Sequence, residues 1–317
     1  MMREKIYEEV VQALLLRGFD VKSFVDANSC FDLIARKQGL ILILKVLSNI
    51  DALRPEHAQE LHKLGHAFQA SALVVGERSR VQELLPSVLY ERYDLPVLSL
   101  HGFVALLDQQ LPMEKSFKGK SVALLDAEKL REEREAREMT LKELSEKASV
   151  SLESLHRYEK GAPTSMEVAE KLERILHTKL IQGINVFQMP EIPKKTEEQI
   201  PYNSALEQLH ELGLKLSVFA HAPLTAAGSE KPLLISQTAN DSTLKRKAFL
   251  LSKTQAIIHH PSMIITKKSK RLQVGNIPVM HEDELSTFSS IEEMMKMLKE
   301  RKHAQRENQQ RQKSRHQ

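Results

Sequence analysis

Residues 140–161 have the sequence TLKELSEKASVSLESLHRYEKG, which predicts two short helices joined by a tight turn. In the first half, Leu141, Leu144 and Ala148 stand at the spacing of one helical face. Thr140 occupies an N-cap position, and Glu143 three residues later completes a capping box. We therefore expect a helix that starts directly after Thr140.

The second helix is expected to follow Ser151, which can cap its first turn. Leu152, Leu155 and Tyr158 recur at intervals of three, and Gly161 offers a C-terminal stop. The sequence thus predicts a helix-turn-helix in which both helices are short and capped.

Packing at the junction predicts which face of the second helix stays free. The small Ser145 allows the two helices to cross steeply, and Val150 can fill the gap behind the turn. The outer face of the second helix is then available to the major groove of DNA, which is wide enough for a helix. The polar residues on this face are Ser151, Glu153, Ser154, His156, Arg157 and Lys160.

Residues 127–180 resemble the phage-repressor (Cro-like, or Xre) class of helix-turn-helix. The resemblance includes a first helix (EKLREEREAREM), the motif, Pro163 after it and a following helix (SMEVAEKLERIL). It implies binding to double-stranded DNA. Leu141 departs from the class, which usually has a phosphate-contacting Gln there. Ser149 stands where the turn usually carries Gly, so it must adopt a left-handed conformation at some cost.

The charge of this region leaves other readings open. Residues 127–161 carry eight Lys/Arg against nine Asp/Glu, whereas many DNA-binding modules show a clear positive surface. A helical hairpin without a DNA role, or a protein-interaction adaptor, would fit that balance. DNA binding is favoured because several independent positions of the motif agree, and because the acids gather on the first helix.

Composition indicates an intracellular protein of two or three domains. The 317 residues are 41% hydrophobic with no Trp, so the cores are aliphatic, and the net charge of +4 allows nucleic acid as a partner. One cysteine excludes an internal disulfide framework and suits a reducing cytoplasm. No apolar run reaches the roughly 20 residues of a membrane helix. We expect a cytoplasmic location, no membrane partner and no cofactor.

Residues 1–108 alternate helices and strands, which predicts an α/β domain with a central sheet. Helices are expected at residues 3–17 and 55–68, with a further helical piece at 80–85 (RVQELL). The aliphatic run LILILKVL is typical of a strand buried on both faces.

This order of elements resembles the restriction-endonuclease-like fold, as in archaeal Holliday-junction resolvases. The resemblance implies an Asp, then an acid and a Lys spaced as (D/E)-x-K, with the acids holding Mg²⁺. Asp32 matches the first acid and Lys45 matches the Lys, but Ile43 stands where the second acid belongs. We therefore expect a vestigial site without catalysis or bound metal. Two alternatives stay open: the site keeps weak DNA cleavage, or Asp32 and Lys45 are only a surface acid and a base at the end of a strand.

The remaining chain is expected to contain a second α/β domain. Residues 109–126 form a connector with a hairpin turning at Lys118-Gly119, residues 127–182 the helix-turn-helix domain, and residues 183–201 a linker. Residues 202–298 echo the first domain, with AIIHH (256–260) as a strand. Residues 299–317, with seven Lys/Arg against two Asp/Glu, are expected to be a disordered basic tail.

The predicted fold class is α/β plus all-α, with two restriction-endonuclease-like domains flanking a phage-repressor-like helix-turn-helix. This three-part order resembles a family of archaeal transcriptional regulators, most specifically in SCFDLIARK and LKVLSNID. It implies DNA-binding regulation. We expect a sequence-specific regulator that is not an enzyme and that forms a homodimer. The predicted DNA-binding residues are Leu141, Lys142, Ser151, Leu152, Glu153, Ser154, His156, Arg157 and Lys160.

Overall fold

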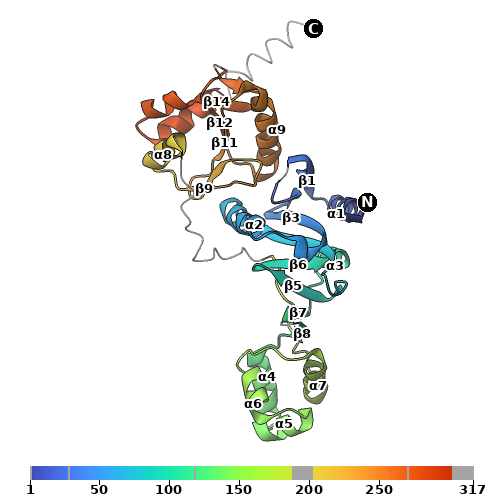
Figure 1. The fold of residues 1–317 in the computed structure, drawn as a ribbon. Coiled ribbons are helices and arrows are strands. Elements are labelled where there is room, and N and C mark those ends of the chain that lie inside the picture. Colours follow the sequence, from blue (N-terminus) through green and yellow to red (C-terminus); the bar gives the residue numbers. More distant parts are fainter. Residues whose placement is uncertain (1, 28, 118, 188–202, 270, 302–317) are drawn as a thin grey trace. The chain divides into compact units, whose positions relative to one another are not determined.

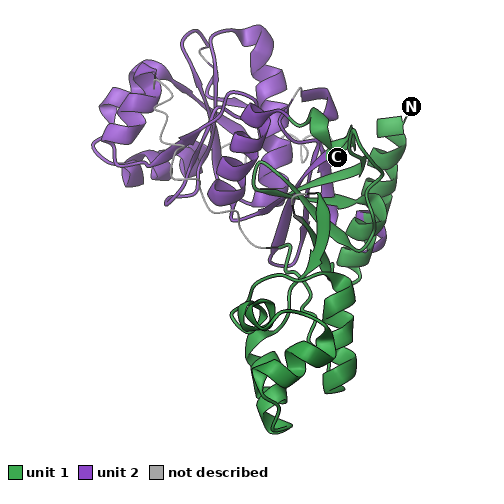
Figure 2. Cartoon of the chain, turned by 60° about the horizontal axis from the view of Figure 1, so that its bottom comes forward, with its two compact units in different colours: residues 1–13, 46–53, 73–188 green, residues 14–45, 54–72, 189–317 purple. Residues whose placement is uncertain are grey.

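The computed structural model describes residues 2–27, 29–117, 119–187, 203–269 and 271–301 (Figure 1). The predicted linker from residue 188 and the predicted basic tail from residue 302 lie outside these residues. The chain divides into two compact units, each made of three separate segments (Figure 2). One unit contains residues 1–13, 46–53 and 73–188, and the other contains residues 14–45, 54–72 and 189–317. The boundaries that the sequence suggests for the domains stay predictions.

The first α/β region has the expected alternation of helices and strands. Its elements are α1 (Met2–Leu16), β1 (Asp20–Ser23), η1 (Val25–Ala27), β2 (Leu33–Lys37), β3 (Leu40–Asn49), η2 (Ile50–Ala52), α2 (Pro55–Phe68), β4 (Ser71–Arg78), β5 (Val88–Arg92), β6 (Leu95–Ser99) and α3 (Leu100–Leu107). The aliphatic run of β3 is buried from residue 42 to 46, as predicted for a central strand.

The predicted helical piece at residues 80–85 is wrong, because this segment is an irregular turn. Ser79 Oγ accepts hydrogen bonds from the amides of Val81 and Gln82, which competes with helical pairing. Val81 is 90% exposed and Leu85 is 53% exposed, so Leu84 is the one apolar residue of this segment whose burial could stabilise a helix.

The strand order of the first sheet is β1-β2-β3-β4-β6-β5-β7-β8. The strands β1, β2 and β3 pair antiparallel, whereas β4 and β6 are parallel. The β5–β6 hairpin turns at Tyr93 and Asp94, which both have positive φ (53° and 61°), as a tight two-residue hairpin turn requires.

The predicted connector hairpin is confirmed. The strands β7 (Glu114–Phe117) and β8 (Lys120–Ala123) pair antiparallel, and Gly119 has φ +78°; Lys118 lies outside the described residues. Backbone pairing continues into the helical domain, where Leu125 forms a bridge with Ile181. The Asp126 amide donates to Leu180 O (2.8 Å), so the incoming and outgoing segments of the helical domain lie side by side.

The helical domain contains α4 (Ala127–Ala136), α5 (Leu141–Ala148), α6 (Leu152–Tyr158) and α7 (Met166–Leu176). Its core is aliphatic, as the composition predicts. The buried members are Ala123, Leu125, Leu130, Leu144, Ala148, Leu155, Ala169, Leu172, Leu176 and Leu180.

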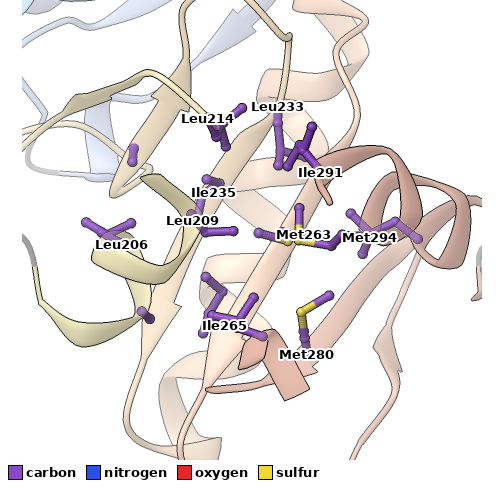
Figure 3. Close-up of a cluster of buried hydrophobic side chains, with 14 residues drawn as sticks. Leu206, Leu209, Leu214, Leu233, Ile235, Met263, Ile265, Met280, Ile291 and Met294 are labelled. Carbon is purple, nitrogen blue, oxygen red and sulfur yellow. The ribbon is translucent and has the colours of Figure 1, made fainter. Parts of the chain in front are cut away.

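The second α/β region consists of α8 (Ser204–Glu211), β9 (Leu216–Val218), β10 (Ala226–Gly228), β11 (Leu234–Thr238), α9 (Asp241–Ile258), β12 (Ser262–Thr266), β13 (Gln273–Val274), β14 (Ile277–His281) and η3 (Glu282–Thr287). Residues 291–301 are helical as well. Aliphatic side chains and methionines such as Ile235, Met263 and Met280 form its core beside α8 (Figure 3).

The second region repeats the topology of the first. Its strand order, β13-β14-β12-β11-β10-β9, matches β5-β6-β4-β3-β2-β1 position by position. The predicted strand at residues 256–260 is wrong, since Ala256–Ile258 is the last turn of α9 and His259 ends the helix with φ +63°. The burial of Leu251, Thr254, Ile257 and Ile258 has helical spacing, and a short apolar run alone does not distinguish helix from strand.

The backbone hydrogen bonds align the two regions residue by residue. In the first, Phe24 N donates to Asp32 O (2.7 Å) and Asp32 N donates to Leu44 O (2.8 Å). In the second, Phe219 N donates to Thr225 O (2.9 Å) and Thr225 N donates to Ile235 O (2.8 Å). Thr225 therefore replaces Asp32, and Ser236, which follows Ile235, replaces Lys45. The second region lacks the charged pair, as the sequence indicates.

Candidate nucleic-acid interface

The turn between α5 and α6 has the geometry that the sequence predicts. Thr140 Oγ1 accepts from the Glu143 amide (3.1 Å), and Glu143 Oε2 accepts from the Thr140 amide (2.7 Å), which completes the capping box. Ser149 has φ 57° and ψ 42°, the left-handed conformation expected of it. Ser151 Oγ caps α6 by accepting from the Ser154 amide (3.0 Å).

The contact between α5 and α6 depends on Leu144, Ala148 and Leu155, which are buried. Ser145 is 4% exposed at the crossing, and its hydroxyl donates to Lys142 O (2.8 Å). Its small side chain allows the helices to approach closely, as predicted. Val150 is partly buried and packs on this core.

The outer face of α6 is open. Ser151, Glu153, His156, Arg157 and Lys160 are exposed, and Ser154 is partly exposed. Leu152 is 51% exposed, so it does not share the buried face of Leu155 and lies with the polar residues. At the start of α5, Lys142 is exposed and Leu141 is partly exposed against the core. The nine predicted DNA-binding residues thus all reach solvent.

The end of α6 is held by an ion pair that sequence reasoning missed. Arg134 on α4 donates from Nε to Glu159 Oε1 (2.6 Å) and from Nη1 to Met139 O (2.9 Å). The side chains of Arg134 and Glu159 are 10% and 8% exposed. The hydrogen bond to Glu159 raises the pKa of Arg134 above its ordinary value. This pair fixes the end of α6 to α4.

A second acid closes the helical domain. Glu173 on α7 accepts hydrogen bonds from the amides of Leu180 (2.7 Å) and Ile181 (3.0 Å). Burial raises the pKa of Glu173, but these amides and Lys179 outweigh it, so the pKa lies below its ordinary value. The sequence signal was an acid beside Leu172 on the apolar face of α7.

The structure brings Asp32 and Lys45 together. Lys45 Nζ donates to Asp32 Oδ1 (3.2 Å) and to Ser29 O (3.2 Å). Lys45 is 9% exposed and Asp32 is 2% exposed. They are a buried pair, not a surface acid and a strand-end base. Ile43, in the place of the second acid, is fully buried. Among the described residues, no group of three or more His, Cys, Asp or Glu side chains could hold a metal ion.

Two further groups, Glu60 and Cys30, lie near this pair. We call the four residues together the Asp32–Lys45 site. Glu60 on α2 is 5% exposed and was not predicted from the sequence. The thiol of Cys30 is fully buried, and burial followed by the nearby Glu60 carboxylate raises its pKa far above the ordinary value. Cys30 is therefore an unreactive thiol.

Comparison with known proteins gives two family models and a set of full-length relatives. The model described as PD-(D/E)XK superfamily domain matches residues 3–112, and the model described as Helix-turn-helix matches residues 130–181. No solved structure matches this chain. In the described part of the chain, no helix is both long enough and apolar enough to cross a membrane.

The relatives are archaeal. A protein of Archaeoglobus fulgidus is 30% identical over 95% of this chain and 99% of its own length. Proteins of Methanothermobacter thermautotrophicus (30% identical, 95% and 97% covered) and Methanobrevibacter smithii (31% identical, 95% and 98% covered) are similar in the same way. Each carries the name "Putative HTH-type transcriptional regulatory protein".

Proposed function

This chain belongs to the archaeal family of HTH-type transcriptional regulatory proteins, and we infer that it regulates transcription by binding duplex DNA through α6. The observation that carries this inference is the separation of the two faces of α6. Leu155 is buried against α5, whereas Arg157, His156 and Lys160 are exposed. A helix that is packed on one face and exposed on the other can enter the major groove of B-DNA.

The side chains of α6 suggest distinct roles. Glu153 can accept a hydrogen bond from cytosine, and Arg157 can donate two to guanine. Ser151, at the start of the helix, and Lys160, just after it, are placed to contact phosphates, which orient a protein without reading sequence. Leu152 and His156 complete the base-facing surface, with Leu152 suited to a thymine methyl group.

The charge of the module supports assembly as a homodimer. Residues 127–161 are nearly neutral, so one module neutralises few phosphates and gains little from counterion release. Two modules joined by a shared scaffold, on half-sites about one helical turn apart, would add their binding free energies. The flanking α/β regions would supply the dimer contact, and the protein would act in the cytoplasm, where its DNA lies.

The nuclease-like region serves this function without cleaving DNA. Ile43 removes one of the carboxylates that a Mg²⁺ site of this fold needs. Asp32, the remaining acid, already accepts a hydrogen bond from Lys45. A plasmid-nicking assay with Mg²⁺ or Mn²⁺ checks this: wild-type protein and Asp32→Ala should leave supercoiled DNA intact, and metal-dependent nicking lost in Asp32→Ala would refute it.

The regulator assignment is tested by selecting bound sequences from a random DNA pool and titrating variants on the selected site. Arg157→Ala should lose discrimination at one base pair by about 1–3 kcal/mol. Lys160→Ala should weaken all sequences alike and reduce the slope of log K against log salt by about 1. Arg131→Ala, which removes one exposed charge from α4, is the matched control and should bind as wild type.

Two outcomes count against this assignment. Equal weakening of every probe by Arg157→Ala and Lys160→Ala would remove the distinction between base and phosphate contacts. Binding that does not depend on salt, or no enrichment of any sequence, would favour a protein-interaction adaptor.

A further inference from the structure

We propose that the Asp32–Lys45 site is an intramolecular docking site, in which the segment 219–221 of the second α/β region binds over the degenerate nuclease centre. The inference does not depend on the DNA-binding assignment. It gives a use to residues that neither catalysis nor DNA contact accounts for.

Glu60 is the first observation. Its Oε1 accepts a hydrogen bond from the Ala220 amide and its Oε2 accepts one from the His221 amide (2.7 Å). Two successive backbone amides thus converge on the two oxygens of one carboxylate, which is a charge-assisted arrangement of the strong kind. Because Glu60 is 5% exposed, these hydrogen bonds compensate for the desolvation of its charge.

His221 is held from its other side as well. The Cys30 amide donates to His221 O (2.6 Å), and the imidazole ring of His57 lies 5.1 Å from that of His221 between centroids. The side chains of Ala220 and His221 are exposed. The segment therefore binds mainly through the backbone of Ala220 and His221, while Phe219 is buried.

The Asp32–Lys45 pair shapes the surface that receives this segment. Lys45 donates to the Asp32 side chain and to Ser29 O, the carbonyl of the peptide group that carries the Cys30 amide. Cys30 is the residue whose amide binds His221. We assign Asp32 and Lys45 a positioning role: the charged pair orients the Cys30 amide.

A second patch supports the same docking. Arg36 on β2 donates from Nη1 to Ile257 O at the C-terminus of α9 (2.9 Å), where a positive charge is favoured by the helix dipole. Lys253 on α9 donates to Ser23 O (2.6 Å), and its Nζ lies 5.4 Å from the centroid of the Phe24 ring. All of these residues belong to one compact unit of the chain (Figure 2).

The consequence for the degenerate centre is that residues 219–221 lie next to it, on Glu60, His57 and the Cys30 amide. A DNA strand would reach Lys45 from this side only after residues 219–221 had left. In the second region, Thr225 and Ser236 stand in the equivalent places, so that copy cannot offer the same charged support. The docking is directional: the second region supplies the segment and the first supplies the site.

Hydrogen exchange resolved to single amides tests the proposal in the full chain. Glu60→Gln should raise the exchange rates of the Ala220 and His221 amides by about tenfold or more, because one charged acceptor is lost. The Phe219 amide, which donates to Thr225 O within the second region, is the internal control and should not change. Glu56→Gln, an exposed acid on the same helix, is the matched control variant.

Two more variants keep the test decisive if Glu60→Gln fails to fold. Arg36→Ala removes the second patch from a partly exposed position and should also accelerate exchange at Ala220 and His221. Lys45→Met should accelerate exchange at the Cys30 amide first. The proposal is overturned if Ala220 and His221 exchange at free-peptide rates in the wild type, or at unchanged rates in folded Glu60→Gln and Arg36→Ala. DNA affinity measured on the same samples should not change, which separates this outcome from failure of the regulator assignment.

Discussion

Arg134 and Glu159 form a buried ion pair, with Nε 2.6 Å from Oε1, that joins the first helix of the helical domain to the residue after the recognition helix. The two residues are 25 positions apart, and each side chain is at most 10% exposed. The position of α6 therefore depends on a buried charge pair with α4, whereas the proposed DNA-facing residues are exposed.

Arg134→Ala should destabilise the helical domain by about 3–5 kcal/mol, because the carboxylate of Glu159 stays buried without its partner. Native-state hydrogen exchange of the α5, α6 and α7 amides measures this loss. Arg131→Ala, which breaks an exposed pair with Glu135, should cost only about 0.5 kcal/mol. Equal losses of unfolding free energy in the two variants would show that the buried pair stabilises the domain no more than the exposed pair does.

Ser149→Gly should stabilise the helix-turn-helix by about 0.5–1 kcal/mol, because Ser149 has φ 57° and glycine adopts this conformation without the Cβ clash. The substitution also removes the hydrogen bond from Lys171 Nζ to Ser149 Oγ (2.8 Å), an exposed contact. Ser149→Ala is the control, since it loses the hydroxyl and keeps the strain. Exchange rates of the same amides should rank the free energies of unfolding as Gly above Ser above Ala.

Asp32→Ala should destabilise the first α/β region by about 3–5 kcal/mol, because Lys45 would remain buried and charged. Adding Lys45→Met should recover a large part of this loss, since an apolar side chain of similar length replaces the unpaired cation. Urea titration of the two single variants and the double variant provides the coupling energy. Additive losses would contradict a direct interaction between the two charges.

Stability of the unit that contains His57 should fall as the pH is lowered. Burial comes first among the causes that lower the pKa of His57, followed by Lys45, His221 and Arg54, while Glu56 opposes them. When the folded state lowers the pKa of a histidine, its contribution to folding stability is fully present at pH values above the ordinary pKa, near 6.5. That contribution is lost as the pH falls below this value, because the unfolded chain binds the proton more readily.

The measurement is thermal unfolding between pH 7.5 and 5.5, compared with His57→Gln. The variant should show a weaker pH dependence over this interval. His260, whose pKa is lowered by burial and by Arg36 and His259, adds a second contribution of the same sign. A slope that is unchanged in His57→Gln would assign the dependence to other groups.

The helix-turn-helix was predictable because its signals are local. The capping box of Thr140 and Glu143, the cap at Ser151 and the left-handed Ser149 involve neighbours in sequence, so the residues themselves determine the conformation. The repeated order of helices and strands was visible for the same reason. Short apolar runs were ambiguous, which explains the wrong strand at residues 256–260.

The contacts that hold distant segments together could not be predicted. Glu60 meets amides 160 and 161 positions away, and Arg36 meets a carbonyl 221 positions away. A backbone acceptor or donor leaves no mark on the side chain at that position, so Ala220 gives no sign of its contact with Glu60. An acid on the buried face of an amphipathic helix was the only available signal, and it marks Glu60 and Glu173 alike.

The pairing of residues 124–126 with residues 180–182 has a consequence for how this architecture can diversify. The chain leaves the hairpin β7–β8, forms four helices and returns to the same place, so the two ends of the helical domain are adjacent. A different recognition module with adjacent termini can be grafted at that junction without redirecting the strands before it. Operator preference can thereby change while the two α/β regions keep their own contacts.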